Sequence, residues 1–169
     1  MSLSLSFIIC EATSTWASAL RVAIARQKDS NSLHAPPRIF ETRTLPELIA
    51  ALSEKAPQLA LVETRPDNLA PILEMFAKRR QPPPFVALLS ESLRPARRAR
   101  LAKWSNHEIV ADALTEAGAL AVVRSPRHIA TVLPLAEKLR ATHTDRSKNF
   151  GDNLSISELA WAALPWQDA

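Results

Sequence analysis

The stretch TLPELIAALSEKAPQLALVE, residues 44–63, shows how this chain is built. It begins with Thr44-x-x-Glu47, a capping box that predicts a helix start, because both side chains can accept hydrogen bonds from backbone N–H groups of the first turn. Apolar residues recur at positions 45, 48, 49 and 52, which places them on one helical face. The short apolar run Leu59–Glu63 follows and ends on a carboxylate, so we expect a buried strand there.

The same alternation of apolar run and helical stretch continues on both sides of this unit. The other expected strands are Leu3–Cys10, Arg38–Arg43, Phe85–Leu89 and Leu120–Val123. The Arg38–Arg43 strand carries too many charges to be covered on both faces, so we expect it at a sheet edge. Five such units predict an α/β fold, namely a flavodoxin-like, doubly wound five-stranded parallel sheet in the order 2-1-3-4-5, flanked by helices.

The chain length and its polar stretches predict one domain and a tail. Residues 1–141 form the expected domain, and residues 142–169 form a polar linker and a short C-terminal helical extension. The tail exposes Trp161 and Trp166, so we expect it to be covered by its own domain or by a second copy in a homodimer. No apolar run reaches the ~20 residues that span a bilayer, and a charged signal-peptide start is missing, so we expect a cytoplasmic protein without a membrane partner.

The composition excludes several kinds of chemistry. The chain has two glycines, so neither a phosphate-cradling P-loop nor a glycine-rich dinucleotide fingerprint can be built. Its single cysteine, Cys10, excludes an internal disulfide and a zinc site with several cysteines. The four histidines are scattered without metal-ligand spacing, and no serine lies in a hydrolase elbow. We therefore expect a protein that is not an enzyme and needs no cofactor.

Polar residues mark the carboxyl ends of the expected strands, where doubly wound sheets bind their ligands. They are Cys10 and Glu11 after the first strand, Glu63 after the third, Ser90 after the fourth, and Arg124, Ser125 and Pro126 after the fifth. These polar strand ends are where we expect any functional site.

The order of these strand-end residues resembles the receiver domain of two-component response regulators, over about residues 3–141. The most specific local match is Glu116-Ala117-Gly118-Ala119 before the last strand. The resemblance implies two acids after the first strand and a phosphoacceptor aspartate after the third. It also implies a threonine or serine after the fourth strand and Lys-Pro after the fifth.

This chain departs from the receiver pattern at three of those positions. Cys10 stands at the first acidic position, and a neutral thiol does not suit Mg²⁺. Glu63 is one methylene longer than aspartate, and such a displacement can cost on the order of 100-fold in rate. Ser125 stands at the lysine position, with Arg124 beside it as a shifted cation. We therefore expect a degenerate pseudo-receiver that has lost its phosphoacceptor chemistry, with a remnant pocket formed by Glu11, Glu63, Ser90, Arg124 and Ser125.

Two interpretations of that pocket stay open at this point. In one, Glu63 lies near Arg124 or Ser90 and imitates a permanently charged site that holds the output face in one state. In the other, Glu11 and Glu63 are remnant polar residues at a solvated rim, where they are paired or hydrated.

A basic run is the strongest signal outside the core. It comprises Arg94, Arg97, Arg98, Arg100 and Lys103, and Trp104 follows it; the whole chain has a formal charge of +4. These residues could bind an acidic protein partner, or nucleic acid through phosphate contacts and stacking. In receiver-like folds the helix-four side is the usual output surface, so the resemblance favours a protein partner. We expect a phosphorylation-independent protein-interaction module in signalling, with a nucleic-acid-binding protein as the alternative.

Overall fold

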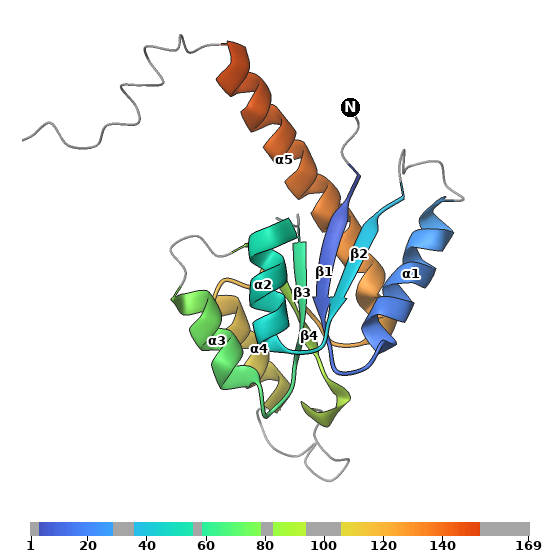
Figure 1. Cartoon of the computed structure of the whole chain (residues 1–169). Coiled ribbons are helices and arrows are strands. Elements are labelled where there is room, and N and C mark those ends of the chain that lie inside the picture. The colour runs from blue at the N-terminus through green and yellow to red at the C-terminus, as the bar shows by residue number, and fades with distance from the viewer. Residues whose placement is uncertain (1–3, 29–35, 56–58, 79–82, 94–105, 153–169) are drawn as a thin grey trace, which may run out of the picture.

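A computed structural model describes residues 4–28, 36–55, 59–78, 83–93 and 106–152. One central sheet is covered by helices on both faces (Figure 1). The strands are β1 (Ser6–Cys10), β2 (Arg38–Thr42), β3 (Leu59–Thr64), β4 (Phe85–Leu89) and β5 (Ala121–Val123). The α-helices are α1 (Thr15–Lys28), α2 (Leu45–Lys55), α3 (Leu69–Ala77), α4 (Asn106–Glu116) and α5 (Val132–Asp152), and the 3₁₀ turns are η1 (Glu91–Leu93) and η3 (Pro126–Thr131).

The sheet is parallel and its strand order is β2-β1-β3-β4-β5, as the sequence predicted. β1 lies between β2 and β3, with Ile8 in register with Phe40 on one side and Ala60 on the other. The order therefore reverses at β1, and the crevice beyond the carboxyl ends of β1 and β3 is the usual ligand position in such sheets. β2 is an edge strand, as its charge pattern indicated.

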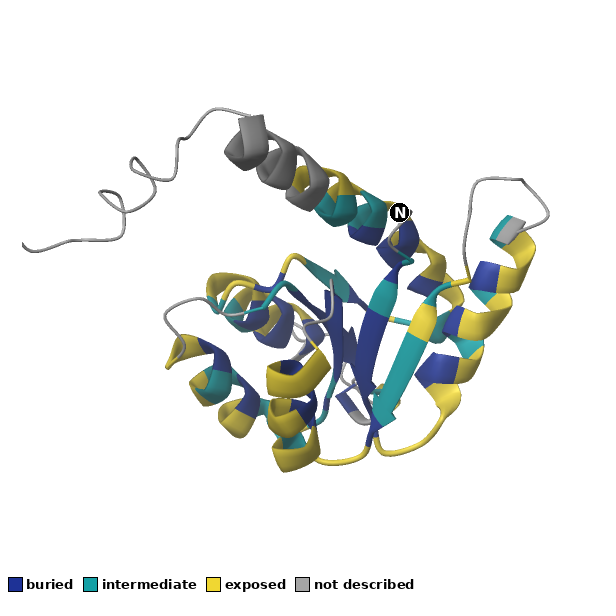
Figure 2. Ribbon diagram, turned by 45° about the horizontal axis from the view of Figure 1, so that its top comes forward, coloured by how far each residue is buried: buried dark blue, intermediate teal, exposed yellow. Residues whose placement is uncertain are grey.

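Two apolar layers hold the sheet, one on each face (Figure 2). Alternation along β3 shows the division: Leu59 and Leu61 pack towards α1 and α5, whereas Ala60 and Val62 pack towards α2, α3 and α4. All four side chains are fully buried, so β3 is covered on both faces and fixes the position of its last residues.

Local signals in the sequence set two helix ends. At the start of α2 the Thr44 hydroxyl accepts a 3.4 Å hydrogen bond from the N–H of Glu47, whose carboxylate accepts one of 2.7 Å from the N–H of Arg43. At the end of α4, Gly118 has φ of 99°, and Ala119 donates back to the carbonyl of Leu114. This is a Schellman ending, and it needs the left-handed conformation that glycine adopts easily.

The structure differs from the sequence predictions in the last third of the chain. The sequence predicts one helix that is capped by Ser125 and kinked at Pro134, but residues 126–131 form η3 and the α-helix begins at Val132. Pro134 therefore lies in the first turn of α5, where its missing N–H leaves no bond unmade. Residues 142–152, expected as part of a polar linker, continue α5, since the segment holds no proline and no glycine before Gly151.

The C-terminal tail beyond residue 152 lies outside the described residues, so the predictions for Trp161 and Trp166 are not tested by the fold. Of the helices in the described ranges, none combines the length and the apolar character that a membrane span requires.

Candidate functional site

A crevice of about 240 Å³ lies at the carboxyl ends of β1 and β3. It is lined by Cys10, Glu11, Ala12, Arg43, Thr44, Leu45, Glu63, Arg65 and Asn68. The loops after β1, β2 and β3 all contribute to it. Glu11 and Glu63, which the sequence placed in one pocket, do meet here.

The carboxylate of Glu11 caps helix α1. Its Oε2 accepts a hydrogen bond of 2.8 Å from the N–H of Trp16, and its Oε1 accepts one of 2.8 Å from the N–H of Ala17. These N–H groups belong to the first turn of α1, where no intrahelical acceptor exists. The residue is only 2% exposed, so Glu11 is paired, as one interpretation expected, but it is buried and not at a solvated rim. Burial raises the pKa of this carboxyl above its usual value, although the two N–H groups act in the opposite direction.

Glu63 is bonded to the loop that precedes α1. Its Oε2 accepts a 2.9 Å hydrogen bond from the N–H of Ala12, which ties the end of β3 to the loop after β1. The amide of Asn68 donates to the carbonyl of Glu63 at 2.9 Å and accepts from the N–H of Arg65 at 2.7 Å. The loop between β3 and α3 is therefore closed on itself and holds Glu63 in a half-buried position.

Two arginines in the crevice were missed by the sequence reading. Arg43 donates to the Ser14 hydroxyl at 2.8 Å, to the Glu41 carboxylate at 3.2 Å and to the carbonyl of Glu11 at 3.4 Å. Glu41 is also paired with Arg21 of α1. Arg43 directly follows β2, so its position at a strand end was the available signal.

Arg65, the second missed residue, directly follows β3. Its Nε lies 3.3 Å from a carboxylate oxygen of Asp67, an ion pair at the molecular surface. That contact lacks hydrogen-bond geometry, so the buried Nε–H has no acceptor in the described structure. The crevice thus holds two guanidinium groups as well as two carboxylates.

Cys10 lines the crevice as a buried free thiol. Burial is the main reason that its pKa lies above the usual value, and the nearby carboxylates of Glu47 and Glu63 act in the same direction. The thiol is therefore neutral, which makes it a poor nucleophile and a poor ligand for a hard cation.

The remaining predicted pocket residues do not line this crevice. Ser90 is half-buried, and its N–H donates to the carbonyl of Thr64 at 3.0 Å. The hydroxyl of Ser125 accepts a 3.4 Å hydrogen bond from the N–H of Arg127 and so caps η3. Arg124 is exposed. The charged-mimic interpretation needs Glu63 to face Arg124 or Ser90, whereas the hydrogen bond of its carboxylate is made to Ala12.

The basic run from Arg94 to Lys103, together with Trp104, lies outside the described residues, so its partner stays a prediction.

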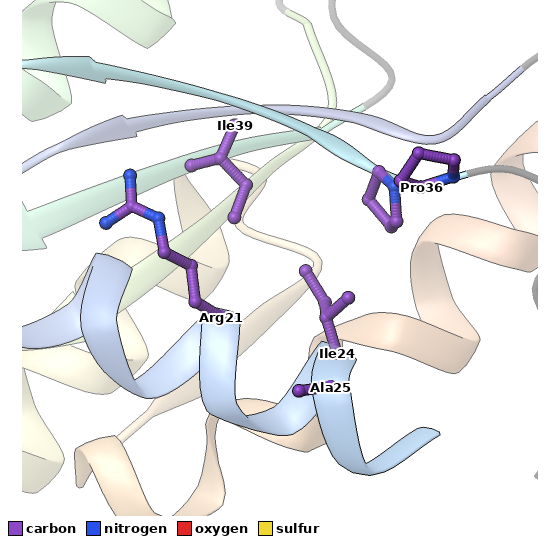
Figure 3. Close-up of a pocket in the computed structure, with 6 residues that line it drawn as sticks. Arg21, Ile24, Ala25, Pro36 and Ile39 are labelled. Atoms are coloured by element: carbon purple, nitrogen blue, oxygen red, sulfur yellow. The ribbon is translucent and has the colours of Figure 1, made fainter. Parts of the chain in front are cut away.

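A second hollow of about 300 Å³ lies between α1 and the start of β2 (Figure 3). Ile24, Ala25, Pro36, Pro37 and Ile39 line it with Arg21. Among these described lining residues, none carries a carboxylate, a thiol or an imidazole.

Comparison with known proteins identifies the fold. No protein-family model matches the sequence, and no curated protein matches it either. Among solved structures, a CheY-like protein, TadZ from Pseudomonas aeruginosa, matches with a TM-score of 0.52 and 15% identity over 81% of this chain and 94% of that one. HP1043, an orphan response regulator of H. pylori, matches with a TM-score of 0.51 and 10% identity over 79% and 96% of the two chains.

A third solved structure is the signal receiver domain assigned to a LuxO repressor from Vibrio parahaemolyticus. Its TM-score is 0.55, with 18% identity over 86% of this chain and 98% of that domain. At these identities the likeness concerns the fold.

Proposed function

We propose that this chain, which has the receiver fold with a five-stranded parallel sheet in the order 2-1-3-4-5, is a signalling module whose state does not depend on covalent phosphorylation. It acts by binding another protein rather than by catalysing a reaction. The single observation that supports this proposal most is that both carboxylate oxygens of Glu11 accept hydrogen bonds from N–H groups at the start of α1.

Phosphoryl transfer in this fold family implies a Mg²⁺ ion, and the residues here do not fit one. Mg²⁺ requires near-octahedral oxygen ligands and is bound through carboxylates. Glu11 is turned into α1, Cys10 is a neutral thiol, and Glu63 is bonded to Ala12. Across the described parts of the chain, no three His, Cys, Asp or Glu side chains form a group that could hold a metal.

Hydrogen bonds, rather than a metal ion, join the loops after β1, β2 and β3. Arg43 contacts Ser14, Glu41 and the carbonyl of Glu11, while Glu63 contacts Ala12. Three loops at the carboxyl end of the sheet are thus joined by the chain's own charged groups. This network supports a module that holds one state without a bound metal.

A protein partner is favoured by apolar exposure next to α4. Ile109 of α4 is 56% exposed, and Leu120, which directly precedes β5, is 48% exposed. The resemblance to receivers implies an output surface on this side of the fold. We propose that a cytoplasmic protein binds there; the homodimer through the tail and the nucleic-acid alternative stay predictions.

The proposal is tested by incubating the full chain with acetyl phosphate and Mg²⁺ and measuring its intact mass. We expect no added phosphoryl group, and no Mg²⁺-dependent rise in melting temperature when beryllofluoride is added. A competent receiver treated in parallel is the positive control. A phosphoryl adduct that disappears in Glu63→Gln would refute the proposal.

A further inference from the structure

The hollow between α1 and the start of β2, which we call the α1–β2 hollow, is lined mainly by apolar groups. The apolar lining residues are Ile24, Ala25, Pro36, Pro37 and Ile39 (Figure 3). A volume of about 300 Å³ is at the lower end of the ~300–1,000 Å³ that ligand pockets have. The hollow therefore suits one large apolar side chain rather than a whole helix.

Arg21 adds a guanidinium group to this lining. The group is already paired with the carboxylate of Glu41. The N–H bonds of a guanidinium lie in its plane, so an aromatic ring can stack on its face while the ion pair is kept. Tryptophan combines a large apolar surface with the strongest attraction of an aromatic ring to a cation. The α1–β2 hollow thus has the chemistry of a site for an indole ring.

The α1–β2 hollow adjoins the open edge of the sheet. The N–H of Arg38 donates to the carbonyl of Leu5, so the backbone groups of Arg38 face β1. This direction alternates along a strand, so the backbone groups of Ile39 and Glu41 face away from β1. Proteins commonly cover such an edge with a helix or a loop. A segment bound in the hollow would lie beside this edge.

The chain itself carries two tryptophans beyond α5. Trp161 and Trp166 belong to residues 153–169, which contain the acids Glu158 and Asp168 and no lysine or arginine. The whole chain has a formal charge of +4, so the positive charge is carried entirely by the residues before this segment. The segment and the domain therefore attract each other electrostatically.

The length of the segment allows it to reach the hollow. Leu139 of α5 packs against the same core cluster as Ile24 and Ile39. From Leu139 to Asp152 the helix rises by about 20 Å. Residues 153–169 span up to ~55 Å when extended, so they can turn back along this face of the sheet.

We propose that the α1–β2 hollow is the docking site of the chain's own segment 153–169 and that it binds the indole ring of Trp161 or Trp166. Docking removes a large aromatic surface from water and covers the open edge at β2. Since β2 and β5 are opposite edges of the sheet, the docked segment leaves Ile109 and Leu120 to a protein partner. This inference goes beyond the proposed function and does not depend on it.

The test is ¹⁹F NMR of the full chain labelled with 5-fluorotryptophan, with each resonance assigned by a single replacement of tryptophan by phenylalanine. We expect one tail resonance to lie away from its position in the urea-unfolded chain. Ala25→Glu should return it to that position, because a carboxylate enters the apolar lining. Val22→Glu adds the same charge to an exposed position of α1 outside the hollow and should leave the resonance unchanged. Trp16, which is buried in the core, reports in the same spectrum that each variant is folded.

A reciprocal variant changes the tail and leaves the hollow intact. In Trp161→Ser combined with Trp166→Ser, the backbone amide resonances of Ala25 and Ile39 should shift, whereas that of Ile109 should not. This variant alters no residue of the described fold, so it also serves if Ala25→Glu does not fold.

Three results would overturn the inference. The first is that both tail resonances of the wild type lie at their unfolded positions. The second is that Ala25→Glu and Val22→Glu act equally, or that the tail variant leaves the amides of Ala25 and Ile39 unchanged. The third is a wild-type tail resonance that returns to its unfolded position on dilution, because the segment then binds a second copy rather than its own domain.

Discussion

Oε2 of Glu11 lies 2.8 Å from the backbone nitrogen of Trp16, and this bond turns a strand-end acid into a helix cap. The cap residue therefore comes from the end of β1, several residues before α1 begins. A carboxylate next to a helix N-terminus is also favoured by the helix dipole. The residue that the receiver resemblance assigns to metal binding is thus part of the fold.

Replacing Glu11 by alanine should destabilise the chain. Glu11→Ala leaves the N–H groups of Trp16 and Ala17 without acceptors in a buried position, at a cost of about 1–3 kcal/mol. Glu11→Gln should cost less, because its amide oxygen can still accept one bond. Urea unfolding at pH 7 measures both. Equal stability of Glu11→Ala and the wild type would contradict the capping role.

Two carboxyls should give the unfolding free energy opposite dependences on pH. Burial raises the folded-state pKa of Glu11 above its usual 4.5, so the stability it contributes is present below pH 4.5 and is lost as pH rises through the folded value. The Arg21 guanidinium lowers the pKa of Glu41, so its contribution is present above pH 4.5 and is lost as pH falls through the folded value.

Urea titrations of the wild type, Glu11→Gln and Glu41→Gln between pH 3 and pH 7 measure this difference. As pH falls, the wild type should gain stability relative to Glu11→Gln and lose stability relative to Glu41→Gln. Glu54→Gln, an exposed position on α2, serves as a surface control. The same slope for both test variants would contradict the assigned pKa directions.

The bond from Ala12 to Glu63 should be visible in amide hydrogen exchange. Glu63→Ala removes the carboxylate that accepts the hydrogen bond of this N–H, so the Ala12 amide should exchange faster than in the wild type. Glu63→Gln retains an acceptor and should exchange at nearly the wild-type rate. NMR-detected exchange measures the residue directly. Unchanged protection in Glu63→Ala would show that the loops after β1 and β3 are not joined in this way.

The fold was predicted well because the alternation of apolar and polar residues, and the positions of charged residues, depend directly on which faces of each element are buried. The charged pattern of Arg38–Arg43 indicated an edge strand, and β2 is at the edge. A glycine after a helical stretch typically marks its end, and Gly118 ends α4 with a positive φ. The prediction of a polar linker was wrong over residues 142–152, because a polar segment that contains no proline can continue a helix that has already begun as readily as it forms a loop.

The site was harder to predict because side-chain direction is set by tertiary contacts. Strand ends brought Glu11 and Glu63 to one crevice, as parallel topology requires. The sequence had no means to show that Glu11 turns back to cap α1, or that Arg43 and Arg65 complete the crevice. Arg124 was the expected cation, and it does not line the crevice.

Replacing Gly118 should test the ending of α4 without steric interference. A Cβ at this position meets nothing within 4 Å, so only the backbone conformation opposes a side chain. Because φ is 99°, Gly118→Ala should lower the unfolding free energy by about 1–2 kcal/mol, and Gly118→Asn should cost less. Urea unfolding measures both. An unchanged stability of Gly118→Ala would show that α4 does not need this ending.

Restoring an acid at the end of β1 should partly restore a cation site. Cys10→Asp places a buried carboxylate near Glu47 and Glu63, so it should destabilise the chain by about 1–3 kcal/mol. A divalent cation can offset that repulsion, so Mg²⁺ should raise the melting temperature of Cys10→Asp. The wild type and the uncharged Cys10→Ser should show no such rise. If the wild type responds to Mg²⁺ as strongly as Cys10→Asp, the residues already hold the ion and the phosphorylation-independent proposal fails.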